Sequence, residues 1–257
     1  MTDRELAHAP EIAAAQTNKD VSEVWYERLN TARGLNTGEA VRAATKAQIR
    51  GYSRFLPNIL GENRDITVYD AGCGPGFMLN ILKELGYFNT MGSDLASDSE
   101  IVGQELGLSI HRKNSITHIS EFSDASFDCV MAIDFIEHLK KEDFLEFIEM
   151  VFIKLKPGGK LILRCPNADT PFVGRHYFND ISHVWTYTST SLELLFSSWG
   201  FRHIHFVDEI IPMIDRYRFF RVPMVYVGSN LIKKIIKWST RENIKILTPS
   251  FWAVVTK

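Results

Sequence analysis

A glycine cluster near residue 70 has the spacing of a ligand-binding loop. Residues 70–76 read Asp-Ala-Gly-Cys-Gly-Pro-Gly and directly follow a short β-rich run, Ile66-Thr67-Val68-Tyr69. Glycines let the backbone turn sharply and approach a ligand closely, and a following helix presents unpaired N–H groups there. Asp94 lies 22 residues after Gly72, where a carboxylate can bind two ribose hydroxyls. The alternative is a tight turn with an unrelated surface acid.

The order of the glycines favours one class of ligand. Dinucleotide-binding loops have a GxGxxG spacing with room for a pyrophosphate, whereas this chain has GxGxG with Asp70 two residues before the first glycine. A carboxylate beside the loop would repel a pyrophosphate and attract a cationic or zwitterionic group, such as an amino group. The spacing therefore disfavours a nicotinamide-dependent oxidoreductase.

Three side chains farther along could act as a general base. Asp134 directly follows a predicted strand, and His138 lies one helical turn later. His183 lies in a long polar and aromatic segment, residues 177–187, and is the preferred candidate. Histidine changes charge near neutral pH, Asp180 could orient it, and the aromatic side chains could exclude water. The alternative is a structural role for either histidine. These groups have no diagnostic metal-ligand spacing, so no metal is predicted.

The elements that position these residues alternate between strands and helices. Residues 20–60 read as two helices with a break at Asn36-Thr37-Gly38. From residue 65 the pattern predicts βαβ units and a mainly parallel sheet. The predicted strands are 66–69, 91–94, 109–111, 127–133, 160–165, 203–207 and 251–256, and the predicted helices are 77–85, 144–155 and 191–199.

Several segments resemble the class I S-adenosylmethionine (SAM)-dependent methyltransferases. Residues 68–76 are similar to the first motif of that family, and Asp94 matches its ribose-binding acid. Residues 127–139, 155–161 and 199–201 resemble its fourth-strand motif, the approach to the fifth strand and the helix end before the sixth. The resemblance covers about residues 60–210 and the final strand. It implies an α/β, Rossmann-like, seven-stranded sheet with an antiparallel last strand, and SAM at the carboxyl ends of the central strands.

The resemblance also implies which residues bind SAM. Asp70 and the glycine loop would line the methionine end, Asp94 the ribose, and the backbone around Ile133 and Asp134 would face the sulfonium. Asn114 departs from the family, which often has Asp there. The cofactor-binding residues are predicted to be Asp70, Gly72, Cys73, Gly74, Gly76, Asp94, Leu95, Asn114, Ser115 and Ile133.

The methyl acceptor is predicted from a looser likeness. Residues 164–201 resemble methyltransferases of polysaccharide and O-antigen biosynthesis, and also quinone-type methyltransferases. Aromatic and polar side chains suit a sugar, whose ring packs on aromatic faces while its hydroxyls form hydrogen bonds. We therefore expect O-methylation of a sugar or glycan-type acceptor with a His base. A quinone, phosphate or lipid-like acceptor is the alternative, and a non-catalytic SAM-binding partner subunit is the alternative of another class. The predicted acceptor-binding residues are Trp25, Tyr26, Arg175, Tyr177, Asp180 and Arg216.

The chain is predicted to form a single methyltransferase domain. Its parts are a helical lid (1–60), the SAM-binding core (61–210), a substrate insert (211–250) and the final strand (251–257). The net charge is -2, but residues 201–257 hold ten Lys or Arg and four Asp or Glu. An anionic group on the acceptor is therefore one expectation, whereas no broad basic stripe supports nucleic-acid binding.

The predicted location is cytoplasmic. The three cysteines form no CxxC pair, residues 1–16 lack the pattern of a signal peptide, and charged residues and Pro223 interrupt the longest apolar stretch, 219–236. In the insert, apolar residues from Leu231 to Trp238 lie opposite several lysines. The alternatives for it are packing on the body, a clamp for a phosphorylated substrate, and contact with a membrane surface.

Overall fold

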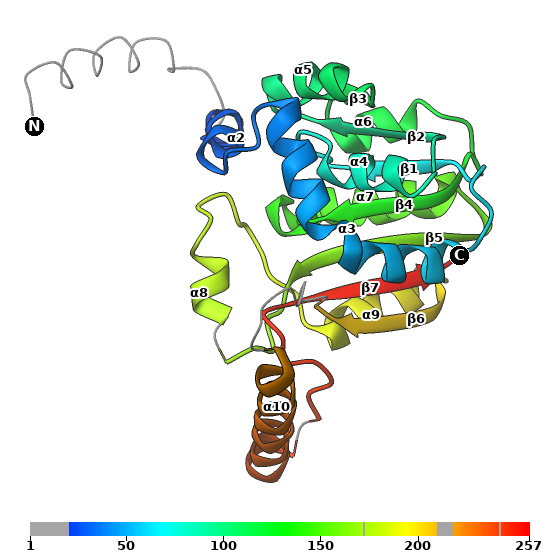
Figure 1. Ribbon diagram of the computed structural model, residues 1–257. Coiled ribbons are helices and arrows are strands. Elements are labelled where there is room, and N and C mark those ends of the chain that lie inside the picture. The colour runs from blue at the N-terminus through cyan, green and yellow to red at the C-terminus, as the bar shows by residue number, and fades with distance from the viewer. Residues whose placement is uncertain (1–20, 172, 210–217, 242) are drawn as a thin grey trace, which may run out of the picture.

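Seven strands form one sheet in the order β3-β2-β1-β4-β5-β7-β6 (Figure 1). The computed structural model describes residues 21–171, 173–209, 218–241 and 243–257. β7 is antiparallel to both of its neighbours, and the other neighbouring pairs are parallel. The strands are β1 Val68–Ala71, β2 Thr90–Asp94, β3 Ser109–Arg112, β4 Phe127–Ile133, β5 Leu155–Pro166, β6 Arg202–Asp208 and β7 Ser250–Thr256. The predicted seven-stranded sheet with an antiparallel last strand is confirmed.

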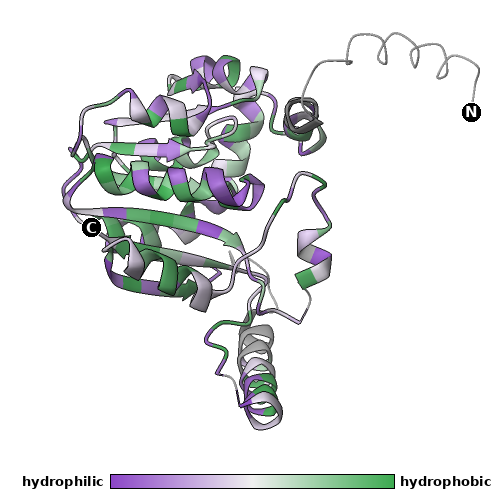
Figure 2. Cartoon of the chain, turned by 180° about the vertical axis from the view of Figure 1, so that it is seen from behind, coloured by the Kyte–Doolittle hydropathy of each residue, from purple (hydrophilic) through white to green (hydrophobic). Residues whose placement is uncertain are grey.

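Helices cover both faces of this sheet. Side chains of α3 and α4 pack on one face, and those of α6, α7 and α9 pack on the other. Figure 2 shows hydrophobic residues along the strands between these layers. The helices are α2 Val21–Ala32, α3 Gly38–Leu60, α4 Phe77–Glu84, α5 Ser97–Leu106, α6 Ser115–Ser120, the 3-10 turn η1 Ile136–His138, α7 Lys141–Lys154, α8 Val173–Tyr177, α9 Ser189–Ser198 and α10 Arg218–Thr240.

Alternation along the strands explains the two layers. On β1, Val68 faces α3 and α4, while Tyr69 faces the opposite layer, and both are fully buried. On β7, Trp252 lies under α3, where its ring meets the ring of Phe55 edge-on at 4.9 Å. The last strand, β7, therefore packs beneath α3, and this contact holds α3 against the sheet.

The break between the first two helices is confirmed at the predicted position. Thr37 caps α3, and its side-chain oxygen accepts a hydrogen bond from the Ala40 N–H at 3.2 Å. As a result, α2 turns away from α3 and lies over the carboxyl ends of the strands (Figure 1). This places the N-terminal helices next to the glycine loop.

Two boundaries differ from the prediction. β5 begins at Leu155 rather than at Lys160, because the segment with Pro157 and Gly158 forms a bulge where the β4–β5 register shifts. The short helix α8 was not among the predicted helices, and it ends at Tyr177, where the polar and aromatic segment 177–187 begins. In the described parts of the chain, no helix has the length and apolar character needed to cross a membrane.

Candidate active site

A cavity of about 350 Å³ lies at the carboxyl ends of the central strands. Its size falls in the range of small-molecule sites. The glycine loop between β1 and α4 forms its floor, the ends of β2, β4 and β5 form its sides, and α2 and α3 cover it. The lining residues from these elements include Leu29, Asn30, Arg33, Gln48, Tyr52, Asp70, Gly72, Cys73, Gly74, Asp94, Ile133, Asp134, His138 and Arg164.

The glycine loop is held in place by buried hydrogen bonds from below. The Gly72 N–H donates to Ser115 Oγ at 3.0 Å, and Ser115 Oγ also lies 2.9 Å from Ser93 Oγ. Ser93 Oγ in turn contacts the Tyr69 hydroxyl at 2.6 Å. Gly72 has φ +65°, and a Cβ there would lie 2.3 Å from the ring of Phe135. Only glycine therefore fits this position without a shift of the loop.

Asp70 is a buried acid without a full set of partners. Its side chain is 2% exposed, and its Oδ1 has no hydrogen-bond partner among the described residues. Burial, and then the charge of Asp94, raise the pKa of Asp70 to about 7. An unpaired buried carboxylate is costly unless a cation compensates it. The cavity wall thus fits the predicted amino group beside the glycine loop.

Asp94 joins the glycine loop to the start of α5. Its Oδ2 accepts a hydrogen bond from the Gly74 N–H at 2.9 Å, and its Oδ1 accepts one from the Ala96 N–H at 2.8 Å. Burial is the largest of the causes that raise the pKa of Asp94. Each carboxylate oxygen has two acceptor sites, so Oδ2 keeps the capacity to accept a ligand hydroxyl. This free acceptor site fits a ribose hydroxyl, and the hydrogen bonds from Gly74 and Ala96 give Asp94 a structural role as well.

Six of the ten predicted cofactor residues line the cavity, and four do not. Gly76 packs against β3, since a Cβ there would lie 2.7 Å from Ile110. Asn114 caps α6 through its side-chain oxygen, Ser115 supports Gly72 from below, and Leu95 is partly exposed beside Asp94. Contact of these four residues with a cofactor stays a prediction. The six lining residues are Asp70, Gly72, Cys73, Gly74, Asp94 and Ile133.

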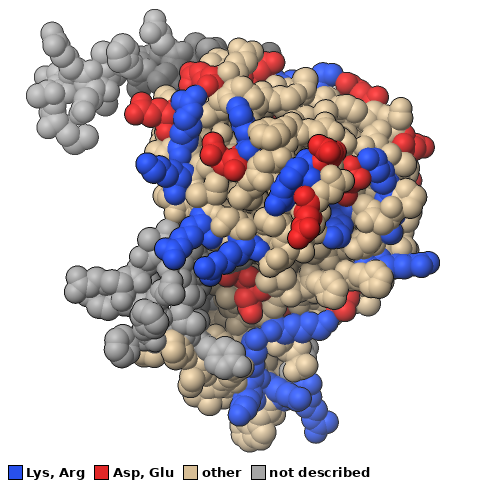
Figure 3. All heavy atoms as spheres, turned by 45° about the vertical axis from the view of Figure 1, so that its right-hand side comes forward, with Lys and Arg blue, Asp and Glu red and all other residues tan. Residues whose placement is uncertain are grey.

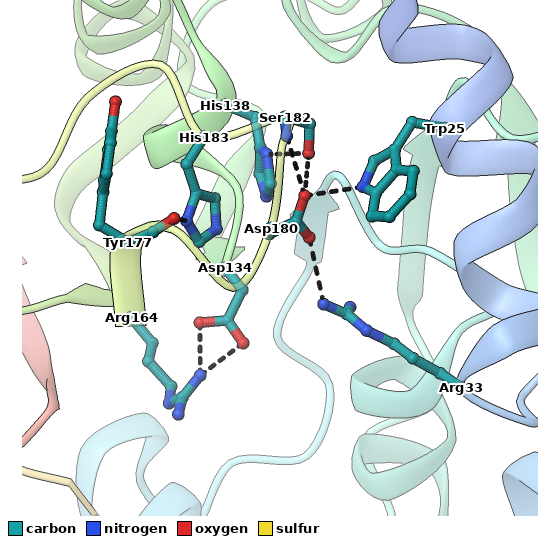
Figure 4. Close-up of polar contacts among 9 residues, drawn as sticks. All are labelled: Trp25, Arg33, Asp134, His138, Arg164, Tyr177, Asp180, Ser182 and His183. Atoms are coloured by element: carbon teal, nitrogen blue, oxygen red, sulfur yellow. Dashed lines mark hydrogen bonds and ion pairs between the residues drawn. The ribbon is translucent and has the colours of Figure 1, made fainter. Parts of the chain in front are cut away.

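Asp134 is tied into an ion-pair network at one side of the cavity. Arg164 of β5 pairs with Asp134 and with Glu209, which follows β6 (Figure 4). Burial lowers the pKa of Arg164, but the charges of Asp134 and Glu209 more than offset this and raise it above its usual range. Asp134 also has φ +52°, an uncommon backbone state for a non-glycine residue. The side-chain oxygens of Asp134 are therefore engaged by Arg164 rather than directed to a ligand.

Arg164 and Glu209 were not selected from the sequence. Arg164 stands in the apolar run Leu161-Ile162-Leu163-Arg164-Cys165, and a charge in a buried strand is a usable signal of a special role. Glu209 has no comparable local signal, because only the sheet order brings the end of β6 near β5.

His138 lies at the cavity wall within a chain of hydrogen bonds (Figure 4). Its Nδ1 lies 3.0 Å from Ser182 Oγ, and the Ser182 hydroxyl donates to Asp180 Oδ1 at 2.5 Å. Because that hydroxyl proton goes to the carboxylate, Nδ1 of His138 is the donor to Ser182. Burial, and then the neighbouring His183, lower the pKa of His138 to about 4. His138 is therefore neutral at physiological pH.

His183 lies beside His138, with 4.8 Å between their ring centroids. Its Nδ1 is 2.8 Å from the Tyr177 carbonyl oxygen, which can only accept, so Nδ1 carries a proton, and in the neutral imidazole the lone pair is on Nε2. The expectation that Asp180 orients His183 is wrong, because the Tyr177 carbonyl makes that hydrogen bond. His183 itself is half-buried and stands next to the cavity wall rather than in it.

Asp180 instead connects this loop to α2. The Trp25 Nε1–H donates to Asp180 Oδ1 at 2.7 Å, and Arg33 pairs with Oδ2 at 3.4 Å (Figure 4). Of the other predicted acceptor residues, Tyr177 is half-buried against His183, and Arg175 is exposed on α8. Arg216 and the side chain of Tyr26 lie outside the described part of the structure.

Glu137, His138 and His183 together could hold a metal ion. One ligand atom from each lies within 4.8 Å of the others. Glu137 is 1% exposed, its Oε2 has no partner in the described part of the chain, and burial raises its pKa well above the usual range. A carboxylate and two imidazoles suit a divalent transition metal. This group was not predicted, since His183 is distant from the other two along the sequence.

Comparison with known proteins identifies a family for most of the chain. The family model described as a methyltransferase domain matches residues 42–205, which is more than half of the chain. The mitochondrial ubiquinone biosynthesis O-methyltransferase of Dictyostelium discoideum is 25% identical over 118 residues, or 40% of this chain and 36% of that protein. The chain spans less than half of the length of the curated relatives that it matches.

Solved structures are similar in fold. A SAM-dependent methyltransferase from Archaeoglobus fulgidus superposes with a TM-score of 0.63 and 20% identity, over 84% of this chain and 94% of that one. Phosphoethanolamine N-methyltransferase 2 of Haemonchus contortus, solved in complex with SAM, gives a TM-score of 0.60 and 16% identity, over 93% of this chain and 60% of that one. At these identities the likeness concerns the fold.

Proposed function

Since the chain belongs to the methyltransferase domain family, we propose that it transfers a methyl group from SAM to a hydroxyl of a sugar or glycan-type acceptor. The observation that carries this proposal is His183, whose ring lies beside His138 of the cavity wall and whose Nδ1 is engaged by the Tyr177 carbonyl oxygen, in a loop rich in aromatic and polar side chains. SAM supplies a methyl group that its sulfonium already activates. The protein must therefore align the acceptor and remove its proton.

In this proposal the glycine loop and two acids hold SAM. Asp70 would pair with the cationic amino group, because its buried Oδ1 has no partner in the described structure. Asp94 would accept hydrogen bonds from the ribose through Oδ2, and the backbone at Gly72 and Gly74 leaves space for the ligand. The remaining candidate contacts, at Gly76, Leu95, Asn114 and Ser115, are not needed by this arrangement.

The acceptor would bind at the mouth of the cavity, beneath α2 and the loop with His183. Nε2 of His183 would take the hydroxyl proton while the Tyr177 carbonyl keeps the imidazole in the required tautomer. Phe178 is exposed on the same loop, and Trp185 is partly exposed with Lys141 Nζ over its ring, so Phe178 is the aromatic side chain there that suits a sugar ring. The bond from Trp25 to Asp180 would hold the lid helix over this region. The proposed setting is cytoplasmic, in keeping with three buried, unpaired cysteines.

Two other acceptor classes remain as alternatives. A quinone-type ring is suggested by the name of the Dictyostelium relative, and a phosphate or lipid-like acceptor by the basic C-terminal part. A SAM-binding partner subunit without turnover is the alternative of another class.

The acceptor is tested by incubating the enzyme with methyl-labelled SAM and extracts of its source cells. Mass spectrometry should find the label as an O-methyl ether on a sugar-containing molecule. Label on a quinone, on a lipid ring or on a protein would contradict the sugar assignment. SAM binding without transfer to any component would favour the non-catalytic subunit.

The affinity for SAM is expected to depend on pH through Asp70. Above its pKa of about 7 the carboxylate is charged and attracts the amino group, so affinity is highest there and falls as pH drops below that value. The fall should approach tenfold per pH unit at the acidic end. Calorimetric titration across this range would measure it.

The variant Asp70→Asn replaces the titratable carboxyl group by an amide of nearly the same shape. It should bind SAM more weakly at neutral pH and with little pH dependence, whereas Asp124→Asn, an exposed acid far from the cavity, should match the wild type. Unchanged pH dependence in Asp70→Asn would disprove the pairing of Asp70 with the amino group.

A further inference from the structure

Helix α10 carries a stripe of exposed apolar side chains. The five residues are spaced by three or four positions, so they share one face of the helix. Their exposed fractions range from 54% to 87%, with the tryptophan the most exposed. The stripe consists of Met224, Val227, Leu231, Ile235 and Trp238. Large apolar side chains gathered in this way mark an interaction surface rather than ordinary surface composition.

The helix projects from the body rather than packing on it (Figure 1). Its C-terminal half is joined to the segment that follows, where Lys233 donates to the Lys245 carbonyl at 2.6 Å and Lys245 pairs with Glu193 of α9 at 2.5 Å. These contacts use the side of the helix away from the stripe. Of the three alternatives for the insert, packing on the body does not hold for this face of the helix.

The charge of α10 indicates what the stripe contacts. Residues 218–240 contain five basic residues, Arg218, Arg221, Lys233, Lys234 and Lys237, and no Asp or Glu. Figure 3 shows Lys and Arg gathered on the part of the surface formed by this helix. Pairing of two copies along the stripe would bring like charges together, whereas an anionic surface would attract them.

The position of α10 relates this surface to the cavity. β6 ends and β7 begins at the carboxyl edge of the parallel strands, and the insert between them leaves the body at that edge. Glu209, which lies between β6 and the insert, pairs with Arg164 in the cavity wall. Whatever α10 contacts therefore lies on the same side of the molecule as the mouth of the site.

We propose that α10 docks the enzyme on an anionic lipid surface. The apolar stripe would lie in the interface between headgroups and acyl chains, with Trp238 at the boundary, and the basic residues would bind the headgroups. Docking would hold the cavity mouth at the bilayer. Docking also bears on the acceptor, and this second part of the proposal rests on the proposed function. Together they imply that the acceptor is a lipid-linked molecule whose polar part reaches His183.

The docking is tested by co-sedimentation of the full chain with vesicles. Phosphatidylcholine vesicles that contain phosphatidylglycerol should bind the wild type at least about tenfold more tightly than pure phosphatidylcholine, and salt should weaken that binding. Leu231→Ser combined with Ile235→Ser should lose roughly tenfold or more, because apolar burial makes a large share of interfacial binding. Lys234→Gln combined with Lys237→Gln should lose binding to anionic vesicles selectively.

A matched control keeps the test independent of folding and of catalysis. Ile101→Ser combined with Leu194→Ser removes two exposed apolar side chains from other helices and should bind vesicles like the wild type. Thermal unfolding and SAM affinity should be unchanged in all variants. Absence of wild-type binding to anionic vesicles would overturn the proposal. A dimer that the stripe variant converts to a monomer, without vesicle binding, would overturn it in favour of a second copy.

Discussion

Gly72→Ala is expected to abolish measurable SAM binding, with a loss of affinity of at least about 100-fold. The residue has φ +65°, where a side chain costs roughly 1–2 kcal/mol. The added Cβ would also lie 2.3 Å from Phe135, whose ring packs edge-on against the buried Phe147 at 5.3 Å. Because that ring has little room, the loop itself must move, and the loop carries the proposed SAM contacts. Calorimetric titration with SAM would measure the loss.

Gly158→Ala separates backbone strain from the clash. Gly158 has φ +77° in the β5 bulge, far from the cavity, and no heavy atom lies within 4 Å of the position of an added Cβ. This variant should lose only about 1 kcal/mol of unfolding free energy and bind SAM like the wild type. Gly72→Ala should lose roughly 2–4 kcal/mol. Wild-type SAM affinity in Gly72→Ala would show that the glycine loop does not hold the cofactor.

The features that could be predicted from the sequence are local in the chain. The glycine loop, Asp94 and the strand at residues 127–133 depend on short-range spacing, and the structure has them at one edge of the sheet. Backbone conformation and alternation act over a few residues, so a single sequence contains the signal. The helix break at Asn36-Thr37-Gly38 is another local signal that was confirmed, and Thr37 caps α3 there.

The arrangement around His183 could not be predicted in the same way. The hydrogen bond that fixes its tautomer comes from a backbone carbonyl, which has no signature in the sequence. Asp180 was expected to pair with His183, but Trp25, 155 positions away, and Ser182 take its carboxylate. The meeting of α2 with this loop is a tertiary contact, and it decides which partner a polar side chain finds.

The ion pairs at the cavity wall show the same limit. The interaction of Arg164 with Glu209 requires β6 to lie at the sheet edge, with β7 between β5 and β6. That order places the basic insert on the same side as the cavity, a relation that the charge count alone did not reveal. The strand order therefore places the excess of basic residues in the C-terminal part beside the cavity mouth, where α10 forms the proposed membrane-binding surface.

His183→Gln is expected to lower turnover by about 10²- to 10⁴-fold while the affinity for SAM stays unchanged. Glutamine can still donate to the Tyr177 carbonyl, so the loop should keep its conformation, but it cannot accept the acceptor proton. The measurement is the rate of methyl transfer to the acceptor identified by labelling, with SAM affinity measured in parallel. His138→Gln is the matched variant, because His138 lies at the cavity wall and has the Ser182 contact instead.

The comparison of the two histidine variants with chelated enzyme decides between a base and a metal ligand. If His183 is the base, dialysis against a chelator should leave turnover unchanged, and only His183→Gln should lose most of it. If Glu137, His138 and His183 hold a divalent ion, both histidine variants and the chelated enzyme should lose turnover. Added metal should then restore the turnover of the chelated enzyme. That second pattern would replace the His base by a metal-bound acceptor oxygen, since a cation lowers the pKa of a hydroxyl that it binds. Full turnover in His183→Gln would contradict both roles.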